Sequence, residues 1–220
     1  MYKVALAIVI LSWSAVHSLN SFAQQKIIRL DLLNKGDFQV INRTVGLSTD
    51  KQGKTIIHLD AKPDVGVAWI NNTNFTTGII EFTVKGKDVL QQSFLGIAFH
   101  EINDSSFDAI YFRPFNFRSI DTARRNHSVQ YISMPKYDWS YLRQNYPGKY
   151  ENALTEAIEP KEWFHAKILV SNESIKVFVN DDDKPSLVVK PLSNSISGKI
   201  GFWVGNNSDG DFSNLILTTN

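Results

Sequence analysis

Apolar and polar residues alternate with a period of two along most of the chain from Lys26 onward. This spacing is typical of β-strands with one buried face, whereas an amphipathic helix repeats about every 3.6 residues. β-Branched and aromatic residues fill the alternating runs, and Gly, Asn and Asp separate them. The runs predicted as strands are 27–32, 55–59, 66–70, 78–84, 94–100, 109–117, 127–133, 163–170, 174–179, 187–189, 199–204 and 212–217.

A dozen short strands with almost no helical periodicity predict an all-β sandwich or barrel. The 220 residues, 43% of them hydrophobic, are enough for one core, and no repeat or low-complexity linker divides them. We therefore expect a single domain over residues 24–220. Its fold class is all-β, a jelly-roll sandwich of two antiparallel sheets.

The N-terminus has the pattern of a secretory signal peptide. Lys3 supplies a positive start, Val4 to Leu11 form a short apolar run, and Ser21-Phe22-Ala23 places small residues at the cleavage positions. The apolar run is too short to span a bilayer comfortably, so an uncleaved anchor is the weaker alternative. We expect residues 1–23 to be removed and the protein to be periplasmic or secreted.

Composition narrows the chemistry. The chain contains no cysteine, which removes disulfides, thiolate nucleophiles, zinc–cysteine sites and a lipoprotein anchor together. Its net charge of +1 gives no global argument for nucleic acid or membrane as a partner. No membrane insertion is expected after signal cleavage.

Residues 134–160 interrupt the strand pattern. Connections of this length inside a compact domain are uncommon and tend to be functional. A short helix is predicted over 139–145, and the segment carries several aromatic residues, Tyr137 and Trp139 among them. Such rings suit the faces of sugars. The alternative is that they pin the loop to the sandwich.

Small residues on one predicted strand indicate a groove. In the run 94–100, Leu95, Ile97 and Phe99 alternate with Phe94, Gly96, Ala98 and His100, and the second set has small side chains at its centre. We expect the first set in the core and the second on an open face.

The next two runs contribute to the same face. Tyr111 and Arg113 share one side of run 109–117. Pro114 interrupts strand pairing, so the alternation after it does not tell which face a residue occupies. In run 127–133 either His127 and Tyr131 face the groove, or Ser128 and Gln130 do, and the sequence leaves both options open.

Positive charge is concentrated in the middle of this nearly neutral chain. The planar fork of arginine suits carboxylate or sulfate groups, which favours an anionic saccharide. The alternative is a solvated loop with local ion pairs. The basic residues of the segment are Arg113, Arg118, Arg124, Arg125, Lys136 and Arg143.

Hydrolysis of a glycosidic bond usually requires two positioned carboxylates. The sequence shows no closely spaced Glu/Asp pair on a predicted strand. Glu81 and Glu101 occupy ordinary outward positions, and Glu151 and Glu156 lie in the 134–160 segment. A two-carboxylate mechanism is therefore unsupported.

Elimination beside a uronic-acid carboxylate requires other groups. A cation neutralises the carboxylate and acidifies the neighbouring C–H, while His or Tyr moves the protons. Arg113, His127 and Tyr131, with His100 nearby, form a candidate set. For each histidine taken alone, a structural hydrogen bond is the alternative.

Metal signals are weak. Asp181-Asp182-Asp183 and Asp209-Gly210-Asp211 carry oxygen ligands that suit a structural calcium, but Asp is also common in turns for backbone reasons. We assign no metal ligand and expect no cofactor.

Several segments together resemble exported bacterial proteins of the concanavalin A-like lectin/glucanase superfamily, close to the 3-keto-disaccharide hydrolase-like domains. The resemblance implies a curved two-sheet jelly roll with a saccharide groove on its concave sheet. Its landmarks are VAWI at 67–70, SFLGIAFH at 93–100, YFRPFNFR at 111–118, HSVQY at 127–131, PGKYE at 147–151 and GFWVGN at 201–206.

The superfamily also implies possible roles for individual residues. Its alginate-lyase-like members work with Arg, Gln, His and Tyr on concave strands, and Gln130-Tyr131 and Tyr111-Phe112-Arg113 are similar to those strands. The acidic cluster of its family 16 glycoside hydrolases is missing here. Fold analogy by itself does not establish an activity.

The sequence thus predicts a carbohydrate-active enzyme that acts on oligosaccharides containing uronic acid by elimination, as a lyase or dehydratase. The alternatives are a glycosidic-bond hydrolase of the 3-keto-disaccharide hydrolase type and a non-catalytic carbohydrate-binding module. The expected catalytic residues are His100, Arg113, His127 and Tyr131. The expected substrate-binding residues are Tyr111, Asn116, Arg124, Gln130, Tyr137, Trp139 and Arg143.

Overall fold

The computed structural model describes residues 26–29 and 33–219. The predicted signal peptide and residues 30–32 of the first predicted strand lie outside this part. Fifteen strands dominate the described chain. They are β1 Lys26–Arg29, β2 Phe38–Ile41, β3 Val45–Thr49, β4 Thr55–Leu59, β5 Gly66–Ile70, β6 Gly78–Lys85, β7 Leu95–Asn103, β8 Ser106–Phe112, β9 Val129–Ser133, β10 Glu151–Asn152, β11 Phe164–Val170, β12 Ile175–Val179, β13 Leu187–Val189, β14 Lys199–Val204 and β15 Gly210–Thr219.

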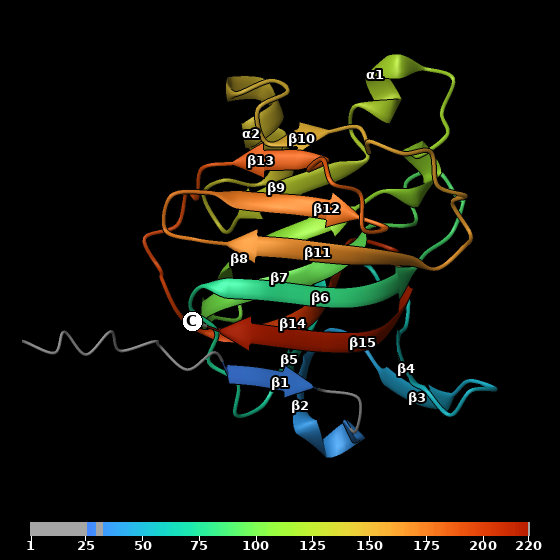
Figure 1. Ribbon diagram of the computed structural model, residues 1–220, viewed down its shortest axis with the longest axis vertical. Helices are drawn as coiled ribbons and strands as arrows, with labels where there is room; N and C mark the ends of the chain where they lie inside the picture. The colour runs from blue at the N-terminus through green and yellow to red at the C-terminus, as the bar shows by residue number, and fades with distance from the viewer. Residues whose placement is uncertain (1–25, 30–32, 220) are drawn as a thin grey trace, which may run out of the picture.

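The strands form two antiparallel sheets stacked as layers (Figure 1). One sheet has eight strands, in the order β13-β12-β11-β6-β15-β4-β3 with β1 also paired to β15. The other has seven, in the order β10-β9-β8-β7-β14-β5-β2. Most spatial neighbours are distant in sequence, as expected for a jelly roll. The predicted all-β, two-sheet architecture is confirmed.

The core lies between the two sheets. Along β6, buried and half-buried residues alternate, which places Ile80, Phe82 and Val84 inside. In the seven-stranded sheet, β5 and β9 are buried on both faces. Large side chains on the outer face of this sheet, such as Trp69 and Tyr111, are therefore packed as well.

Two short helices stand at one end of the sandwich (Figure 1). Helix α1 spans Thr122–Arg125, and Asp121 caps it by accepting from the backbone N–H groups of Ala123 and Arg124. Helix α2 spans Trp139–Asn145, as predicted, and Asp138 caps it in the same way. Among the described residues no helix is long and apolar enough to cross a membrane.

Both sheets end in very short strands on the side of α2. Strand β10 has two residues and β13 has three. The side-chain amide of Asn152 on β10 donates to the carbonyl of Ser186, just before β13, at 2.9 Å. These two edges are thus linked across the end of the sandwich (Figure 1).

Most predicted strands are present, some with shifted ends. The runs 55–59, 66–70, 187–189 and 199–204 coincide with β4, β5, β13 and β14. The run 109–117 is wrong beyond Phe112, because Pro114 begins a 3₁₀ turn at Pro114–Asn116.

Candidate functional site

Three neighbouring strands place polar side chains in one row on the outer face of the seven-stranded sheet. Tyr111 on β8 pairs with Gln130 on β9, and Gln130 pairs with Glu151 on β10. Residues opposite each other in register project from the same face. All three are nearly inaccessible to solvent. The structure matches neither of the two options for run 127–133 in full: Gln130 faces outward with Tyr111 and Tyr131 faces the core, while His127, which precedes β9, also reaches Glu151.

Three basic side chains surround the buried carboxylate of Glu151. Arg143 donates two hydrogen bonds to it, from Nε to Oε1 at 2.9 Å and from Nη2 to Oε2 at 2.6 Å. His127 Nδ1 lies 2.8 Å from Oε2, and Arg113 Nη1 lies 3.6 Å from it. Glu151 is only 3% exposed, so these contacts compensate a charge that water does not reach. We call Tyr111, Arg113, His127, Gln130, Arg143 and Glu151 the Glu151 cluster.

Arg113 holds the cluster together from inside. Its Nη1 donates to the His127 carbonyl at 2.9 Å, and its Nη2 donates to the Tyr111 hydroxyl at 2.6 Å and to Gln130 Oε1. Its guanidinium also lies over the Tyr111 ring at 4.8 Å. Burial lowers the pKa of Arg113, yet an arginine in proteins stays charged. Arg113 is thus a buried anchor with internal partners.

His127 is the cluster member best placed to exchange a proton. Its side chain is 28% exposed. Nδ1 lies 2.8 Å from Glu151 Oε2 but does not form a hydrogen bond of regular geometry with it, and the carboxylate charge favours a proton on this nitrogen. Nε2 is then the acceptor nitrogen, and no residue of the described chain bonds to it.

Burial lowers the pKa of His127, and the charges of Arg143 and Arg113 lower it further, while Glu151 raises it. The net shift is downward, which favours the neutral imidazole. A neutral imidazole with a fixed tautomer and a free nitrogen is a competent general base.

Besides His127 Nδ1, two buried polar side-chain atoms at the cluster have no hydrogen-bond partner within the described residues. They are Gln130 Nε2 and Asn116 Oδ1. Asn116 uses its Nδ2 to donate to the His127 carbonyl at 3.2 Å. Unpartnered buried polar atoms are uncommon and costly, and they are often found where a ligand or water completes a site.

Helix α2 covers one side of the cluster with an aromatic ring. Arg143 stacks on Trp139 with its guanidinium carbon 5.2 Å from the ring centroid, and Trp139 is 50% exposed. Tyr137 packs edge-on against Tyr141 close by. The structure thus brings the predicted residues Trp139 and Arg143 together. Tyr137 is half-buried and packs against the core, which fits the alternative that loop aromatics pin the segment.

The expected open space above Gly96 is filled. Gly96 pairs with Trp203 on one side and Tyr111 on the other, and these two rings meet with centroids 4.7 Å apart. Glycine therefore permits ring packing across β7. It does not leave a vacant groove at that position.

His100 and Tyr131 lie apart from the cluster, on the core side of the sheet. A register shift after Phe99 and a left-handed φ of 57° at His100 turn that side chain away from the face predicted for it. His100 Nε2 donates to the Thr76 carbonyl at 2.6 Å, and Nδ1 lies 3.3 Å from Asp108 Oδ2. The outward position expected for His100 is wrong, because strict alternation does not survive a β-bulge.

Tyr131 completes this second, structural group. Its hydroxyl donates to Asp108 Oδ1 at 2.9 Å and accepts from the Leu192 backbone N–H at 3.0 Å. Burial, followed by the charge of Asp108, raises the pKa of Tyr131. A buried hydroxyl with two fixed partners is poorly suited to exchanging protons with a substrate.

The remaining candidates lie at the margins. Arg124 donates to the Phe115 carbonyl at 3.4 Å, on the turn that follows Arg113. Sequence reasoning missed Glu151, the centre of the cluster, because a two-residue strand gives too short an alternation to recognise. The signal next to it was the turn pair Pro147-Gly148 followed by an aromatic residue, as at the start of a strand.

The described residues contain no group of three or more His, Asp or Glu side chains arranged to hold a metal ion. Three of the five aspartates considered for calcium lie within ion-pair distance of a basic side chain. Asp181 contacts His165 at 3.0 Å, Asp209 contacts Lys87 at 2.5 Å, and Asp211 contacts His58 at 2.7 Å.

No family model and no curated protein matches this chain. Solved structures do match in fold. A Bacillus subtilis protein with a galectin-like fold is 12% identical with a TM-score of 0.58, and the match covers 88% of this chain and 96% of that one. Bacillus licheniformis β-glucanase is 12% identical with a TM-score of 0.54, covering 89% and 98%. The carbohydrate-binding module CBM66 from Bacillus subtilis is 11% identical with a TM-score of 0.51, covering 84% and 92%.

At these identities the likeness concerns the fold alone. The chain is a two-sheet jelly roll with the concanavalin A-like and galectin-like architecture of these proteins. Its function has to be argued from the Glu151 cluster.

Proposed function

We propose that this protein is a carbohydrate-active enzyme that cleaves uronic-acid-containing oligosaccharides by elimination. The observation that carries the proposal is the position of His127, a partly exposed imidazole that lies against the buried Glu151, with Arg113 and Arg143 on the same carboxylate. The carbohydrate class is further supported by the sequence resemblance and by the saccharide-related names of the fold neighbours.

In the proposed reaction His127 Nε2 removes the proton from the carbon next to the uronate carboxylate. The electron pair of that C–H bond forms a carbon–carbon double bond, and the glycosidic C–O bond breaks. The leaving oxygen takes a proton from the imidazolium or from water. Glu151 stabilises the imidazolium that forms, as a buried carboxylate does for a catalytic histidine.

The charge of the cluster favours an acidic substrate. Arg113 and Arg143 together exceed Glu151 by one positive charge. Arg143 uses Nε and Nη2 on Glu151, and within the described chain its Nη1 has no partner. With a 35% exposed side chain, Arg143 is better placed than Arg113 to neutralise a uronate carboxylate.

Glu151 is the only carboxylate among the described residues that contacts Arg113, His127 or Arg143. A single, fully engaged carboxylate gives no support to a two-carboxylate hydrolysis. The predicted signal peptide leads us to propose that the enzyme acts in the periplasm or outside the cell.

A non-catalytic binding role is the second candidate. It is favoured because most hydrogen-bonding groups of the cluster pair with one another. Arg113, for example, donates to His127, Tyr111 and Gln130. Such a network also suits a rigid binding surface.

The test is the absorbance of the conjugated double bond while purified protein is incubated with uronic-acid oligosaccharides. We expect a rising signal that falls roughly 10²–10⁴-fold in His127→Ala, because the general base is removed. This variant keeps the backbone carbonyl to which Arg113 and Asn116 donate. The matched control is His165→Ala, a similarly exposed histidine on the other sheet that pairs with Asp181.

Three results would contradict elimination. Shorter products with unchanged absorbance would indicate a hydrolase, including one of the 3-keto-disaccharide hydrolase type. Saturable binding without product would indicate a binding module. Equal activity in His127→Ala and wild type would remove His127 from the mechanism.

A further inference from the structure

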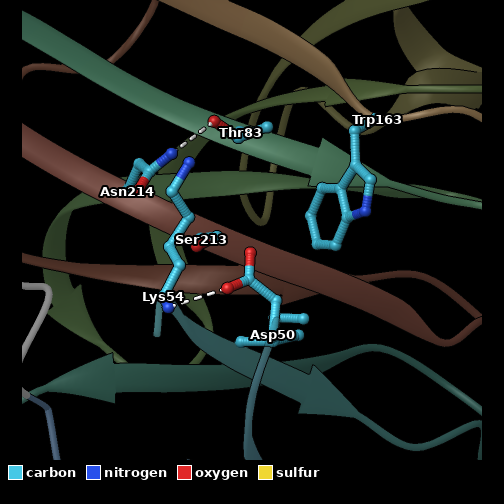
Figure 2. A pocket seen from close by; sticks show the side chains of 7 residues that line it. Asp50, Lys54, Thr83, Trp163, Ser213 and Asn214 are labelled. Atoms are coloured by element: carbon cyan, nitrogen blue, oxygen red, sulfur yellow. Dashed lines mark hydrogen bonds between the residues drawn. The ribbon is translucent and has the colours of Figure 1, made fainter. Parts of the chain in front are cut away.

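A second site lies on the opposite face of the sandwich. A hollow of about 230 Å³ opens on the outer face of the eight-stranded sheet (Figure 2). The sequence had predicted a groove on the other sheet. Its lining residues come from the β3–β4 hairpin, β4, β6, β15 and the segment before β11. They are Asp50, Lys54, Ile56, Thr83, Trp163, Ser213 and Asn214.

A β-bulge shapes the floor of this hollow. The register between β15 and β6 shifts between Ser213 and Ile216, and Asn214 adopts a left-handed φ of 53°. The bulge lets Ser213 and Asn214 both contribute to the hollow, while Phe212 and Leu217 stay in the core. Asparagine is one of the few residues besides glycine that adopt left-handed backbone readily, so it suits this position in the bulge.

The hollow presents unused hydrogen-bonding groups. Asp50 Oδ1 accepts from the backbone N–H groups of Gln52 and Lys54, and Asn214 Nδ2 donates to Thr83 Oγ1 at 3.1 Å. Asp50 Oδ2, Lys54 Nζ and Asn214 Oδ1 have no partner in the described part of the chain. Figure 2 shows the Asp50 carboxylate pointing into the space between Lys54 and the indole of Trp163.

We propose that this hollow is a second saccharide site, which binds one neutral sugar ring. A flat, partly exposed indole offers an apolar face, and the free oxygen and nitrogen atoms offer both acceptors and a donor, which matches the hydroxyl groups of a sugar. The charges of Asp50 and Lys54 cancel, so the site has no preference for an ion.

The size of the hollow limits the ligand. Pockets that enclose drug-sized molecules measure roughly 300–1,000 Å³. At about 230 Å³ this one suits a single ring, with the rest of an oligosaccharide outside. The proposal does not depend on the elimination chemistry, because its residues lie on the other sheet.

The experiment follows the indole N–H signals by NMR in the full chain carrying His127→Ala, which keeps any turnover slow. Cellobiose, xylobiose, mannobiose and lactose are added as separate probes. We expect one of them to shift the Trp163 signal, which Trp163→Phe identifies, and to saturate at roughly millimolar concentration, as small ligands in shallow sites do.

Variants then separate binding from folding. Binding of the active probe to the variants is measured by isothermal titration calorimetry, because Trp163→Ala lacks the Trp163 signal. Trp163→Ala is expected to weaken binding at least tenfold. Asp50→Asn is expected to weaken it severalfold by removing the charge at Oδ2, while its Oδ1 still accepts from the turn. Asn214→Gly removes the side chain, and glycine adopts the left-handed φ easily. Weaker binding in this variant would therefore reflect the lost side chain and not a misfolded protein. The matched control is Trp139→Ala, which changes the other face and should leave this binding intact.

The proposal is overturned if no neutral probe shifts the Trp163 signal, if Trp163→Ala and Asn214→Gly bind as well as wild type, or if only the Trp139 signal responds. Saturable shifts at Trp163 without any elimination activity would support this second site and contradict only the proposed function. Elimination activity without any shift at Trp163 would contradict the second site.

Discussion

One carboxylate determines how the other residues of the candidate site behave. Glu151 keeps His127 in one tautomer, uses two nitrogens of Arg143 and lies within ion-pair distance of Arg113. Because it is buried, removing its charge leaves two guanidinium groups without their counterion. The ionisation of His127 therefore reports on the whole cluster.

The pKa of His127 provides a test that is independent of any substrate. In the folded protein burial lowers it below its usual value, so folding favours the neutral ring. This contribution to stability is present above the unfolded-state pKa and is lost as pH falls through the folded pKa. Glu151 raises the pKa, so Glu151→Gln should lower it further, measured by an NMR titration of the ring protons.

A rise of the His127 pKa in Glu151→Gln would contradict the pairing described here. Glu81→Gln serves as the control, because Glu81 lies on the other sheet near His165. It should leave the His127 titration unchanged.

Tyr131 permits a separate test of structural against functional importance. In Tyr131→Phe, Asp108 loses a donor and the Leu192 N–H loses its acceptor. We expect a loss of about 2 kcal/mol in the free energy of unfolding, measured with denaturant, because buried partners are left unsatisfied. Saccharide binding at the Glu151 cluster should not change. Tyr146→Phe, at an exposed ring, should be neutral, and weakened binding in Tyr131→Phe would argue against a purely structural role.

At the scale of the elements, β7 controls how its neighbours pack. Gly96 lets the rings of Tyr111 on β8 and Trp203 on β14 meet above the strand between them. Tyr111 in turn accepts from Arg113 and donates to Gln130. The order of the Glu151 cluster thus depends on a residue without a side chain, three strands away from β10.

Gly96→Ala should be strongly destabilising. Its new Cβ would lie 2.0 Å from the Ile110 carbonyl oxygen, which is backbone and has no room to move. We expect a loss of about 3 kcal/mol in unfolding free energy. The matched control is Gly36→Ala, whose Cβ would meet nothing within 4 Å and whose effect should stay within about 0.5 kcal/mol. Similar thermal midpoints for the two variants would contradict this account of Gly96.

Long, regular strands could be predicted from the sequence because alternation over five or more residues is a strong signal. The two-residue β10 gives no such signal, so Glu151 was missed although Arg113, His127 and Arg143 were found from their charge and chemistry. His100 was placed on the wrong face because a bulge changes the alternation without leaving a mark in composition.

At the scale of the whole molecule, the two outer faces differ. The seven-stranded sheet carries the Glu151 cluster, with excess positive charge, and the eight-stranded sheet carries the neutral hollow beside Trp163. A short oligosaccharide does not reach both faces of a sandwich whose sheets stack about 10 Å apart and whose outer side chains add to that span. The two sites should therefore bind independently, and only a long polymer or two separate chains would engage both.

The short strands β10 and β13 have a consequence for many copies of the protein at once. A protein that gathers on a polysaccharide surface, as our proposal requires, is crowded against its own copies, and long free strand edges would then pair with one another into continuous sheets. Here two residues on one sheet and three on the other, tied by Asn152 to Ser186, leave little backbone at this end for a neighbour to extend. The same short strands that are hardest to recognise in the sequence thus protect this end of the molecule against fibrous self-association.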